Sequence, residues 1–446
     1  MARLFVYTIG KDKLLVGNFN KKTIKDINLA GKRVLLRADY NVPDIESDYR
    51  IKQSVPTIER ILEQKPQLLI IISHLGRPKR ATPSLSLQPI ARQLSQLLNR
   101  RVYFAPDCIG DEVKGTVGRL KDGDALMLEN LRFHEGEEGN SHEFAKSLVE
   151  ATGAEVFVQD GFGVVHRAHA STDAITRLLP SVAGLLLQKE AETINRVMKD
   201  PDRPLVAVIG GAKISDKLEA MNCLVELADY VAVGGAMANN FLKIKGHSIG
   251  KSLYDKDDLK LAREVLNKAE AKARKQAFNI LLPVDVVVST SAEGRAPTRI
   301  VDLTSHTLSD IEAYPRLPKP KSYRVGQNEA ICDIGPISAA RIAGLIGLAK
   351  TVIWNGTLGV TETRGIAAAQ APFSHGTRVV AEAMIGPHNQ HPTKPFSLVG
   401  GGDTSGYVES AGLTDDFDHV STGGGASLEL MAGKKLPGIE ALDDKQ

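Results

Sequence analysis

The sequence has few cysteines, few aromatic residues and no long apolar run. Its 446 residues include three cysteines, one tryptophan and 5% aromatic residues in total. Cys108, Cys223 and Cys332 lie far apart and form neither a CxxC pair nor a Cys/His pattern, so we expect core thiols in a reducing compartment and no structural zinc. The first apolar run, residues 4–9, is too short for a signal peptide, and no later run could span a membrane. We therefore expect a cytoplasmic protein with no membrane partner.

Neither sign of charge dominates the chain. Lys and Arg number 56 against 53 Asp and Glu, a net charge of +3, which disfavours nucleic acid or an anionic membrane surface as the main partner. A nucleic-acid site would also need aromatic residues interleaved with the basic ones. The P-loop pattern GxxxxGK[ST] and the Rossmann pattern GxGxxG are both absent, which disfavours a P-loop kinase and a standard dehydrogenase.

Short apolar segments alternate with segments of helical period, a pattern that predicts an α/β fold with mainly parallel sheets. In the first half, strands are predicted at 34–38, 68–73, 102–104, 125–128 and 156–159. In the second half, they are predicted at 205–209, 230–233, 280–288, 351–354 and 396–399. A helix over 188–199 is followed by Pro201 and Pro204, and we interpret it as a connector between two domains. For residues 292–328 we predict loops or irregular strands without chemistry.

An anion site is predicted where the 205–209 strand meets paired glycines at 210–211. Ser and Asp at 215–216 favour a helix N-terminus, whose backbone N–H groups and partial positive charge attract phosphate. Lys213 and Lys217 are four residues apart and could share one helical face. An isolated Gly-Gly-x-Lys is more often a plain turn with solvated lysines, so other segments must decide between the two interpretations.

Polar side chains follow the predicted strands of the first half. Because the carboxyl ends of parallel strands meet at one edge of a sheet, five arginines and three histidines could converge there and hold a small, multiply anionic substrate. Each residue alone is better explained as a surface charge or a structural polar group, so the prediction rests on their repetition at successive strand ends. The set consists of Arg37, Arg50, Arg77, Arg132, Arg167, His74, His166 and His169, accompanied by Asp39 and Asn41.

A second glycine cluster, residues 400–402, follows the 396–399 strand and precedes Asp403 and Thr404. The carboxylate could bind a metal while the hydroxyl and backbone amides contact phosphate oxygens, as phosphoryl transfer requires. Glycines 423–425 could add further N–H donors. Taken separately, each run is also explained as a plain turn.

Six motifs resemble those of the phosphoglycerate kinase family in order and spacing, and the match runs from about residue 20 to 442. They are SHLGRP at 73–78, LENLRFH at 128–134, HRAHAS at 166–171, GGAK at 210–213, WNG at 354–356 and GGGDT at 400–404. The resemblance implies two Rossmann-like three-layer domains with mainly parallel sheets, joined by an interdomain helix and a hinge. The implied limits are 1–187, the helix 188–200, 201–423, and a segment 424–446 that returns to the first domain. Residues 1–19 are an extension with no predicted role.

The resemblance also implies reversible phosphoryl transfer from 1,3-bisphosphoglycerate to ADP with Mg²⁺, giving 3-phosphoglycerate and ATP in glycolysis or gluconeogenesis, by a monomer. The rival hypothesis is a catalytically silent paralogue that binds a metabolite or a protein. Such a paralogue should have lost the residues facing the phosphoryl group, yet Arg50, Lys213, Lys217 and Asp403 are all present.

The family's functional positions can be carried over to this chain one by one. The catalytic positions fall on Arg50, Lys213 and Lys217. The phosphoglycerate positions fall on Asp39, Tyr40, Asn41, Arg50, His74, Leu75, Gly76, Arg77, Arg132 and Arg167. The nucleotide positions fall on Lys213, Lys217, Gly235, Asn355, Glu362, Gly401, Gly402, Asp403 and Thr404, with Glu362 expected at the ribose and Asp403 at the magnesium ion.

The chain departs from the family's usual residues at Tyr40, within residues 159–163, and at Thr357 and Thr361, and its segments 305–327 and 363–374 are longer than usual. The reactive polar positions are unchanged. The departures therefore bear on packing around the nucleotide and on nucleotide preference.

Overall fold

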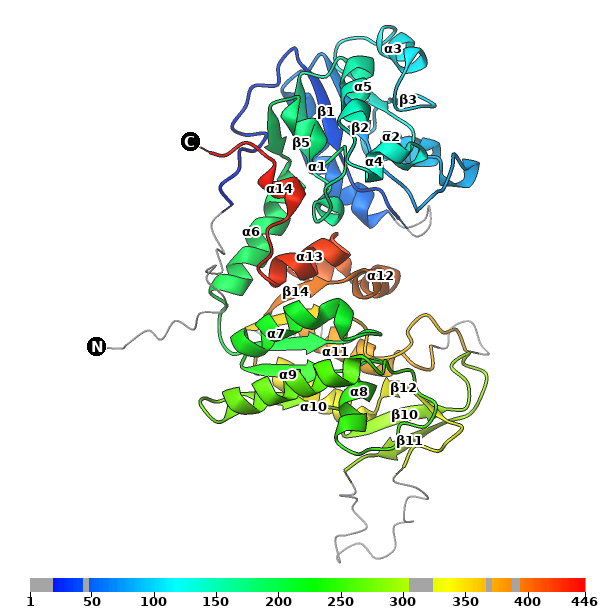
Figure 1. Ribbon diagram of the computed structural model, residues 1–446, viewed down its shortest axis with the longest axis vertical. Helices are drawn as coiled ribbons and strands as arrows, with labels where there is room; N and C mark the ends of the chain where they lie inside the picture. Colours follow the sequence, from blue (N-terminus) through cyan, green and yellow to red (C-terminus); the bar gives the residue numbers. More distant parts are fainter. Residues whose placement is uncertain (1–18, 43–47, 305–323, 366–370, 387–393, 446) are drawn as a thin grey trace, which may run out of the picture. The chain divides into compact units, whose positions relative to one another are not determined.

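The computed structural model (Figure 1) describes residues 19–42, 48–304, 324–365, 371–386 and 394–445. The described chain divides into two compact units. One contains the residues up to Arg196 together with those from Gly425 onward, and the other runs from Val197 to Gly424. Almost all of the N-terminal extension, most of segment 305–327 and part of 363–374 lie outside the described residues.

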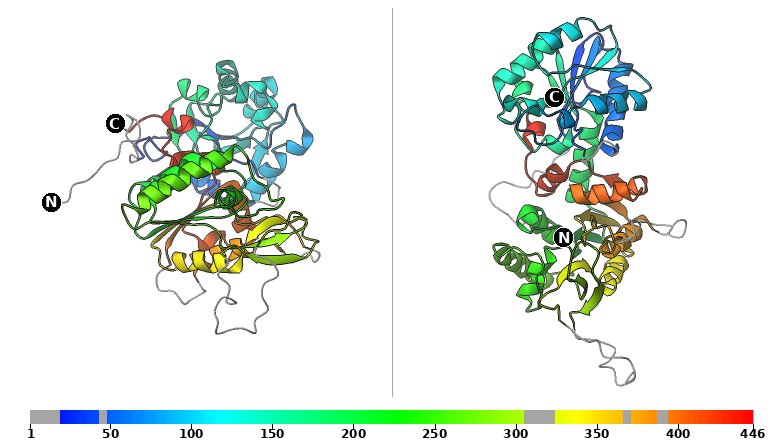
Figure 2. Two further views of the ribbon diagram at one scale, coloured as in Figure 1. Left: turned by 60° about the horizontal axis from the view of Figure 1, so that its bottom comes forward. Right: turned by 90° about the vertical axis from the view of Figure 1, so that its right-hand side faces the viewer.

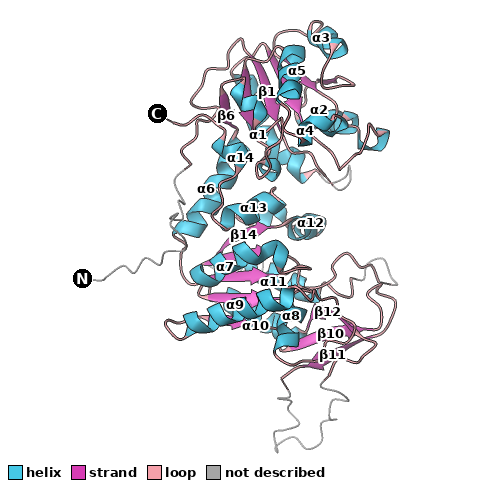
Figure 3. Cartoon of the chain, in the orientation of Figure 1, coloured by secondary structure: helices cyan, strands magenta, loops and turns pink. Residues whose placement is uncertain are grey.

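The first unit is built on a six-stranded sheet in the order β3-β4-β2-β1-β5-β6, and all neighbouring strands are parallel. Figure 3 shows these strands side by side with helices around them. The strands are β1 (Arg33–Arg37), β2 (Leu68–Ile72), β3 (Val102–Phe104), β4 (Asp124–Met127), β5 (Val156–Gln159) and β6 (Ser181–Ala183). Since β1 lies between β2 and β5, the segments that follow these strands emerge at the same edge of the sheet.

Two apolar cores cover the two faces of this sheet, because successive side chains of a strand point to opposite faces. Val34 and Leu36 of β1 belong to one core, and Leu35 belongs to the other. The first core includes residues of α1 (Tyr49–Glu63) and α2 (Gln88–Leu97), and the second includes residues of α3 (Asp111–Val117) and α5 (His142–Thr152). Figure 2 shows the blue strands between blue helices and blue-green helices. The predicted three-layer α/β arrangement is confirmed.

Helix α6 (Leu185–Lys199) begins three residues earlier than the helix predicted over 188–199. The carboxylate of Asp160 explains the earlier start, because its Oδ1 accepts hydrogen bonds from the backbone N–H groups of Leu186 (3.0 Å) and Leu187 (3.3 Å). Free N–H groups at a helix start are satisfied in this way.

The C-terminal segment contains α13 (Gly424–Met431) and α14 (Pro437–Glu440). From Gly425 onward it belongs to the first unit. Among the described residues, four backbone hydrogen bonds attach its end to that unit: Gly438 N to Val165 O (2.8 Å), Asp443 N to Ser181 O (2.9 Å), Lys22 N to Asp443 O (2.8 Å) and Lys445 N to Asn20 O (2.9 Å).

The second unit contains another six-stranded parallel sheet, in the order β15-β14-β13-β7-β8-β9. Its strands are β7 (Leu205–Ile209), β8 (Tyr230–Val233), β9 (Asn279–Leu281), β13 (Thr351–Asn355), β14 (Phe396–Gly400) and β15 (His419–Val420). Its helices include α7 (Leu218–Leu227), α8 (Ala238–Ile244), α9 (Asp258–Ala273), α10 (Pro336–Ile346), α11 (His375–Ile385) and α12 (Gly402–Ser410). In the described residues no helix combines the length and apolar character needed to cross a bilayer.

The single strand predicted over 280–288 is two strands in different sheets. Pro283 lies between them and lacks the N–H that a ladder needs, so β9 ends and β10 (Asp285–Ser289) starts a separate antiparallel sheet. The partners of β10 are β11 (Thr298–Asp302) and β12 (Ala330–Ile334). Strand β11 is therefore a regular strand in the region where we predicted loops or irregular strands.

Candidate functional site

The segments after β1 and β2 hold the first group of predicted site residues together. Arg50, in the first turn of α1, places its Nη1 2.8 Å from Oδ2 of Asp39 and donates a second hydrogen bond to the Asn41 carbonyl at 3.1 Å. The side chain of Asn41 in turn accepts a hydrogen bond from Gly76 N at 2.8 Å. The sequence placed these residues up to 37 positions apart, and the sheet brings them into one hydrogen-bonded set.

Gly76 joins this set to Arg132, which lies in the 3₁₀ turn η2 (Leu131–Phe133) after β4. The Gly76 carbonyl accepts a hydrogen bond from Arg132 Nη1 at 2.7 Å. The φ of Gly76, +66°, is a conformation that favours glycine. Burial lowers the pKa of Arg132, and the charges of Arg167 and Arg77 contribute to that lowering. Several cations thus act on one another at this sheet edge, a field that favours a multiply anionic ligand.

His74 is buried at 3% exposure, and its Nδ1 lies 3.2 Å from Nη2 of Arg37. Burial holds the pKa of His74 well below 6.5, and the Arg37 charge acts in the same direction. Arginine can only donate hydrogen bonds, so the His74 ring is neutral, accepts at Nδ1 and carries its proton on Nε2.

Arg37 and Glu137 form a buried polar network behind His74. Arg37 is fully buried and donates from Nε to Ser171 Oγ at 2.8 Å. The Ser171 hydroxyl donates to Glu137 Oε1 at 2.6 Å, and Glu137 Oε1 lies 3.9 Å from Arg37 Nη2. From the sequence we predicted Arg37 as one of the cations at the strand ends, and we did not predict a role for Glu137. Glu137 lies in α4 (Glu135–Glu138), an acidic run that resembles a solvated surface, so no local signal identified it.

The remaining predicted residues of this set have different surroundings. The side chains of Tyr40 and Leu75 are part of the apolar core, and the Tyr40 hydroxyl is 2.8 Å from Ser54 Oγ. Arg77 is exposed. Arg167 donates from Nε to His166 Nε2 at 3.0 Å. Of this set, the polar side chains of Asp39, Asn41, Arg50, His74 and Arg132 make the contacts described above.

In the second unit, glycines at the carboxyl ends of β7, β8 and β13 pack backbone against backbone. Gly210 N donates to Asn355 O at 2.9 Å, and Gly235 N donates to Leu358 O at 3.1 Å. A Cβ added at Gly210 would lie 2.1 Å from the Thr357 carbonyl oxygen, and one added at Gly235 would lie 2.5 Å from Gly211 N. Only glycine fits at these positions.

The two lysines of the 210–217 segment point to different partners. Lys217 donates from Nζ to the carbonyls of Gly210 (2.7 Å) and Asn355 (3.3 Å), and burial lowers its pKa from 10.5 to about 8. Lys213 is more exposed, with its Nζ 3.3 Å from Asp255 Oδ2. Both lysines therefore flank the glycine segment through different contacts.

The prediction that Lys213 and Lys217 share a helical face is wrong. Residues Ser215–Lys217 form a short 3₁₀ turn, η5, and helix α7 begins at Leu218. The reason is the carboxylate of Asp258, whose Oδ2 accepts hydrogen bonds from Ile214 N (2.7 Å) and Ser215 N (3.2 Å). These N–H groups are already satisfied within the protein, so a phosphate would have to be held by other groups.

Asn355 is the residue in the second unit whose surroundings most clearly indicate a ligand. It is buried at 1% exposure, yet neither polar atom of its amide has a partner among the described residues. Its amide faces Gly401, where an added Cβ would lie 3.1 Å from Oδ1. Buried polar groups without a partner are rare and call for an explanation, and a polar ligand beside Gly401 would supply the missing hydrogen bonds.

Helix α12 starts directly after Gly401, so its free N–H groups and positive end adjoin Asn355. Thr404 is fully buried, and its hydroxyl accepts a hydrogen bond from Gly356 N at 2.6 Å. Asp403, in the first turn, is exposed and favours the charged form of Lys217. Magnesium is usually held by one or two carboxylates together with substrate phosphates, so the chemistry of this exposed carboxylate at a helix N-terminus fits Mg²⁺. Glu362 is exposed.

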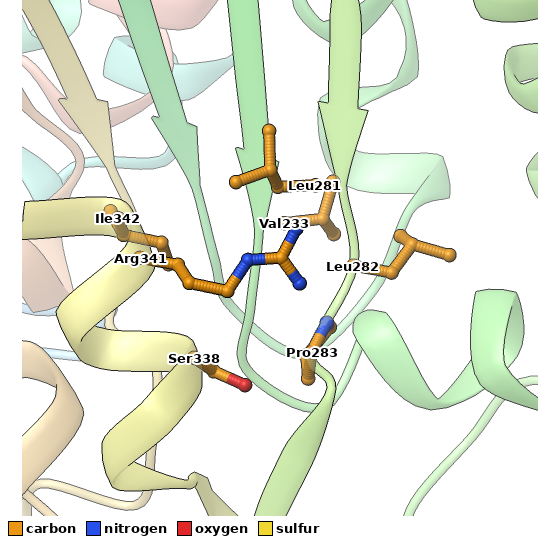
Figure 4. Close-up of a pocket in the computed structure, with 7 residues that line it drawn as sticks. All are labelled: Val233, Leu281, Leu282, Pro283, Ser338, Arg341 and Ile342. Atoms are coloured by element: carbon orange, nitrogen blue, oxygen red, sulfur yellow. The ribbon is translucent and has the colours of Figure 1, made fainter. Parts of the chain in front are cut away.

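A small pocket elsewhere in the second unit is lined by Val233, Leu281, Leu282, Pro283, Ser338, Arg341 and Ile342. Figure 4 shows the Arg341 side chain extending across it. Its volume of about 10 Å³ is enough for roughly one water molecule. The pocket is therefore too small for a nucleotide.

Comparison with known proteins identifies the family to which this chain belongs. The family model described as phosphoglycerate kinase matches residues 24–434 of this chain. Among curated relatives, the phosphoglycerate kinase of Pelotomaculum thermopropionicum is 43% identical over 430 residues, which cover 95% of this chain and 100% of the relative. That of Chloroherpeton thalassium is 44% identical over 430 residues, covering 95% and 99%.

Two solved structures are similar to this chain over nearly its full length. The phosphoglycerate kinase of Coxiella burnetii has a TM-score of 0.74 at 36% identity and covers 94% of this chain and 98% of its own. That of Pyrococcus horikoshii has a TM-score of 0.77 at 29% identity, with the same coverage. A family model that matches nearly the whole chain and full-length relatives above 40% identity lead to one conclusion: the chain belongs to the phosphoglycerate kinase family.

Proposed function

We propose that two sets of residues, one in each unit, carry out the phosphoglycerate kinase reaction in this protein. As a member of the family, the chain is a kinase of glycolysis that binds ATP and transfers a phosphoryl group to a carboxyl acceptor. In our proposal the first unit binds 3-phosphoglycerate or 1,3-bisphosphoglycerate and the second binds ATP or ADP with Mg²⁺.

The phosphoglycerate set is proposed to act as a group of cations and fixed donors around the substrate's anionic ends. Arg50 is held by Asp39, Arg132 is held by Gly76, and the neutral His74 presents an N–H. Arginine binds carboxylate and phosphate through paired hydrogen bonds. Arg77 and Arg167 add positive charge, and Asn41, Leu75, Tyr40 and Gly76 are proposed to shape the site.

The nucleotide set is supported most strongly by one observation: the Asn355 amide is buried without a partner for either polar atom among the described residues. Its position beside Gly401 and the start of α12 suits phosphate oxygens. We propose that Gly235, Gly401, Gly402 and Thr404 approach the nucleotide with Lys217, and that Glu362 contacts the ribose. The ion is proposed to bind at Asp403, where it would offset phosphate charge.

Catalysis is proposed to be electrostatic. A phosphoryl group in transfer spreads negative charge over its equatorial oxygens, so cations fixed around it lower the energy of the transition state more than that of the ground state. Arg50, Lys213 and Lys217 are proposed for this role. Lys213 must then exchange its contact with Asp255, 3.3 Å away, for the phosphoryl oxygens.

A coupled assay of the purified chain with 3-phosphoglycerate, ATP and Mg²⁺ tests the function. We expect turnover that stops on exhaustive chelation and returns when Mg²⁺ is added. Turnover that survives chelation would contradict the metal assignment. No turnover, together with normal binding of 3-phosphoglycerate by calorimetry, would favour the silent paralogue.

The domain limits 1–187, 188–200, 201–423 and 424–446, the hinge near residues 200–204 and the cytoplasmic, monomeric state also remain proposals. The hinge is supported by the chemistry, since transfer requires reacting atoms about 3 Å apart in a site closed to water. Small-angle scattering should show a smaller radius of gyration with both substrates than with either alone. Light scattering coupled to size-exclusion chromatography tests the monomer.

A further inference from the structure

A cluster of metal-ligating side chains lies in the first unit, apart from the residues assigned above. Asp107 and Cys108 follow β3, and His134 follows η2 after β4. Because β3 and β4 are parallel neighbours, the segments at their carboxyl ends come together. A carboxylate oxygen of Asp107, Sγ of Cys108 and a ring nitrogen of His134 all lie within 4.8 Å of one another. No other group of three or more such side chains meets this criterion among the described residues.

Hydrogen bonds hold the side chains of the cluster in place. His134 Nε2 is 2.6 Å from Asp107 Oδ1, and Cys108 Sγ donates to the Glu129 carbonyl at 2.9 Å. Zinc binds thiolate at about 2.3 Å and imidazole or carboxylate at about 2.0 to 2.2 Å, so its ligand atoms are roughly 3 to 4 Å apart. Small side-chain rotations would therefore bring the three donors to zinc-binding distances.

The nearby carboxylate of Asp107 and the exposed side of the cluster favour a cation at this position, whereas burial raises the pKa of the Cys108 thiol, whose proton a bound ion has to displace. Cys108 is fully buried, whereas the side chains of His134 and Asp107 are 26% and 44% exposed, which leaves an open side for an ion and a bound water. The His134 ring is fixed by stacking on Phe144 at 5.2 Å between centroids. In the described part of the chain, no lysine or arginine lies within ion-pair distance of Asp107.

We propose that Asp107, Cys108 and His134 form a binding site for a divalent cation of the Zn²⁺ class. A thiolate, an imidazole and a carboxylate together are a donor set for zinc, while Mg²⁺ prefers oxygen ligands alone. The ion would join the Asp107–Cys108 segment to the start of α4, because His134 directly precedes Glu135. This site is independent of the proposed function and of the ion at Asp403.

The sequence could not reveal this site, and we expected no structural zinc from it. The histidine is 26 residues from the cysteine, outside the short Cys/His spacings of zinc motifs. Only the pairing of β3 with β4 brings the two segments together.

The test uses Co²⁺ as a coloured substitute for Zn²⁺, added to the untagged, full-length chain in a reductant without thiols. We expect a thiolate-to-cobalt charge-transfer band and the visible bands of tetrahedral Co²⁺, saturating at about one equivalent and lost when Zn²⁺ is added. The Cys108→Ser and His134→Gln variants should each bind Co²⁺ and Zn²⁺ about a hundredfold more weakly. Cys223→Ser, at a half-buried cysteine in the second unit, is the matched control and should leave the spectrum unchanged.

The proposal is overturned if the wild-type chain shows no charge-transfer band, if either folded variant binds Co²⁺ as tightly as the wild type, or if Cys223→Ser abolishes the band. Circular dichroism of each variant shows whether it folds. His134 is partly exposed, so His134→Gln decides the question even if Cys108→Ser, in the core, fails to fold.

Discussion

The guanidinium of Arg37 lies behind the imidazole of His74, with 3.2 Å between Arg37 Nη2 and His74 Nδ1. Arg37 is itself anchored by Ser171, which also binds Glu137. This arrangement leaves one hydrogen-bonding role for each ring nitrogen of His74. Nδ1 accepts from the protein, and Nε2–H remains to donate to an anionic ligand.

The first prediction compares two amide replacements of His74. Glutamine can place an N–H near the Nε2 position, whereas the shorter asparagine reaches only the Nδ1 position. We expect His74→Gln to retain a kcat/KM for 3-phosphoglycerate about tenfold higher than that of His74→Asn, the loss expected for one hydrogen bond to a charged group. Steady-state kinetics with 3-phosphoglycerate varied gives the comparison. The reverse order would show that Nδ1 faces the substrate.

The second prediction concerns the cations proposed at the phosphoryl group. Arg50→Ala and Lys213→Ala should each lower kcat by roughly a hundredfold or more while KM changes less, because these groups stabilise charge that is largest in the transition state. Lys79→Ala is the control, since Lys79 is an exposed cation of the first unit. If either alanine variant has the same kcat as Lys79→Ala, the proposed role of that residue is refuted.

The success of the sequence predictions depended on how local the determining interactions are. The strand Leu205–Ile209 and the glycines after it were predicted because an apolar run and a Gly-Gly turn are local patterns. The convergence of Asp39, Asn41 and His74 was also predictable, because parallel strands bring their carboxyl ends to one edge.

Other features depend on contacts between distant segments, which no local pattern specifies. The Asp258 carboxylate satisfies N–H groups 43 and 44 residues away and converts a predicted helix start into a 3₁₀ turn. Glu137 is fully buried and accepts a hydrogen bond from Ser171, which lies 34 residues later in the chain. We predicted one strand across Pro283, and neither the break there nor the change of sheet that follows it was predicted.

The third prediction tests the glycine packing in the second unit. In Gly210→Ala the new methyl group would lie 2.1 Å from the Thr357 carbonyl oxygen, so the backbone must move. We expect a loss of about 1–3 kcal/mol in the free energy of unfolding, as for overpacked sites, together with weaker ADP binding. Gly406→Ala in α12 is the matched control, because nothing lies within 4 Å of its added Cβ. It should raise stability by about 0.5–1 kcal/mol.

Urea unfolding and ADP calorimetry measure both effects in the two glycine variants. Equal stabilities for Gly210→Ala and Gly406→Ala would mean that the β7 and β13 segments separate easily. The packing would then not be a fixed part of the nucleotide site.

The fourth prediction follows from Lys217, whose pKa is lowered to about 8 because its ammonium group is buried. Below pH 8 the group is charged, and above it the folded chain loses that charge while the unfolded chain keeps it until about 10.5. The unfolded state therefore binds more protons between pH 8 and 10.5, so the contribution of Lys217 to the free energy of unfolding rises with pH across this window.

Nucleotide binding should respond to pH in the opposite direction. A phosphate beside Nζ favours the charged form, so binding above pH 8 must take up a proton, and ADP affinity should fall by up to about tenfold per pH unit there. In Lys217→Arg the group stays charged, so this part of the pH dependence should disappear. Lys213→Arg is the matched control, because Asp255 raises the pKa of Lys213 and that lysine stays charged over the same range.

Calorimetry from pH 7 to 9, in two buffers of different protonation enthalpy, gives both affinity and proton uptake. Ionisation of ADP is common to all three proteins and cancels in the comparison. A Lys217→Arg variant that keeps the wild-type slope would show that another group titrates and that Lys217 does not face the phosphates.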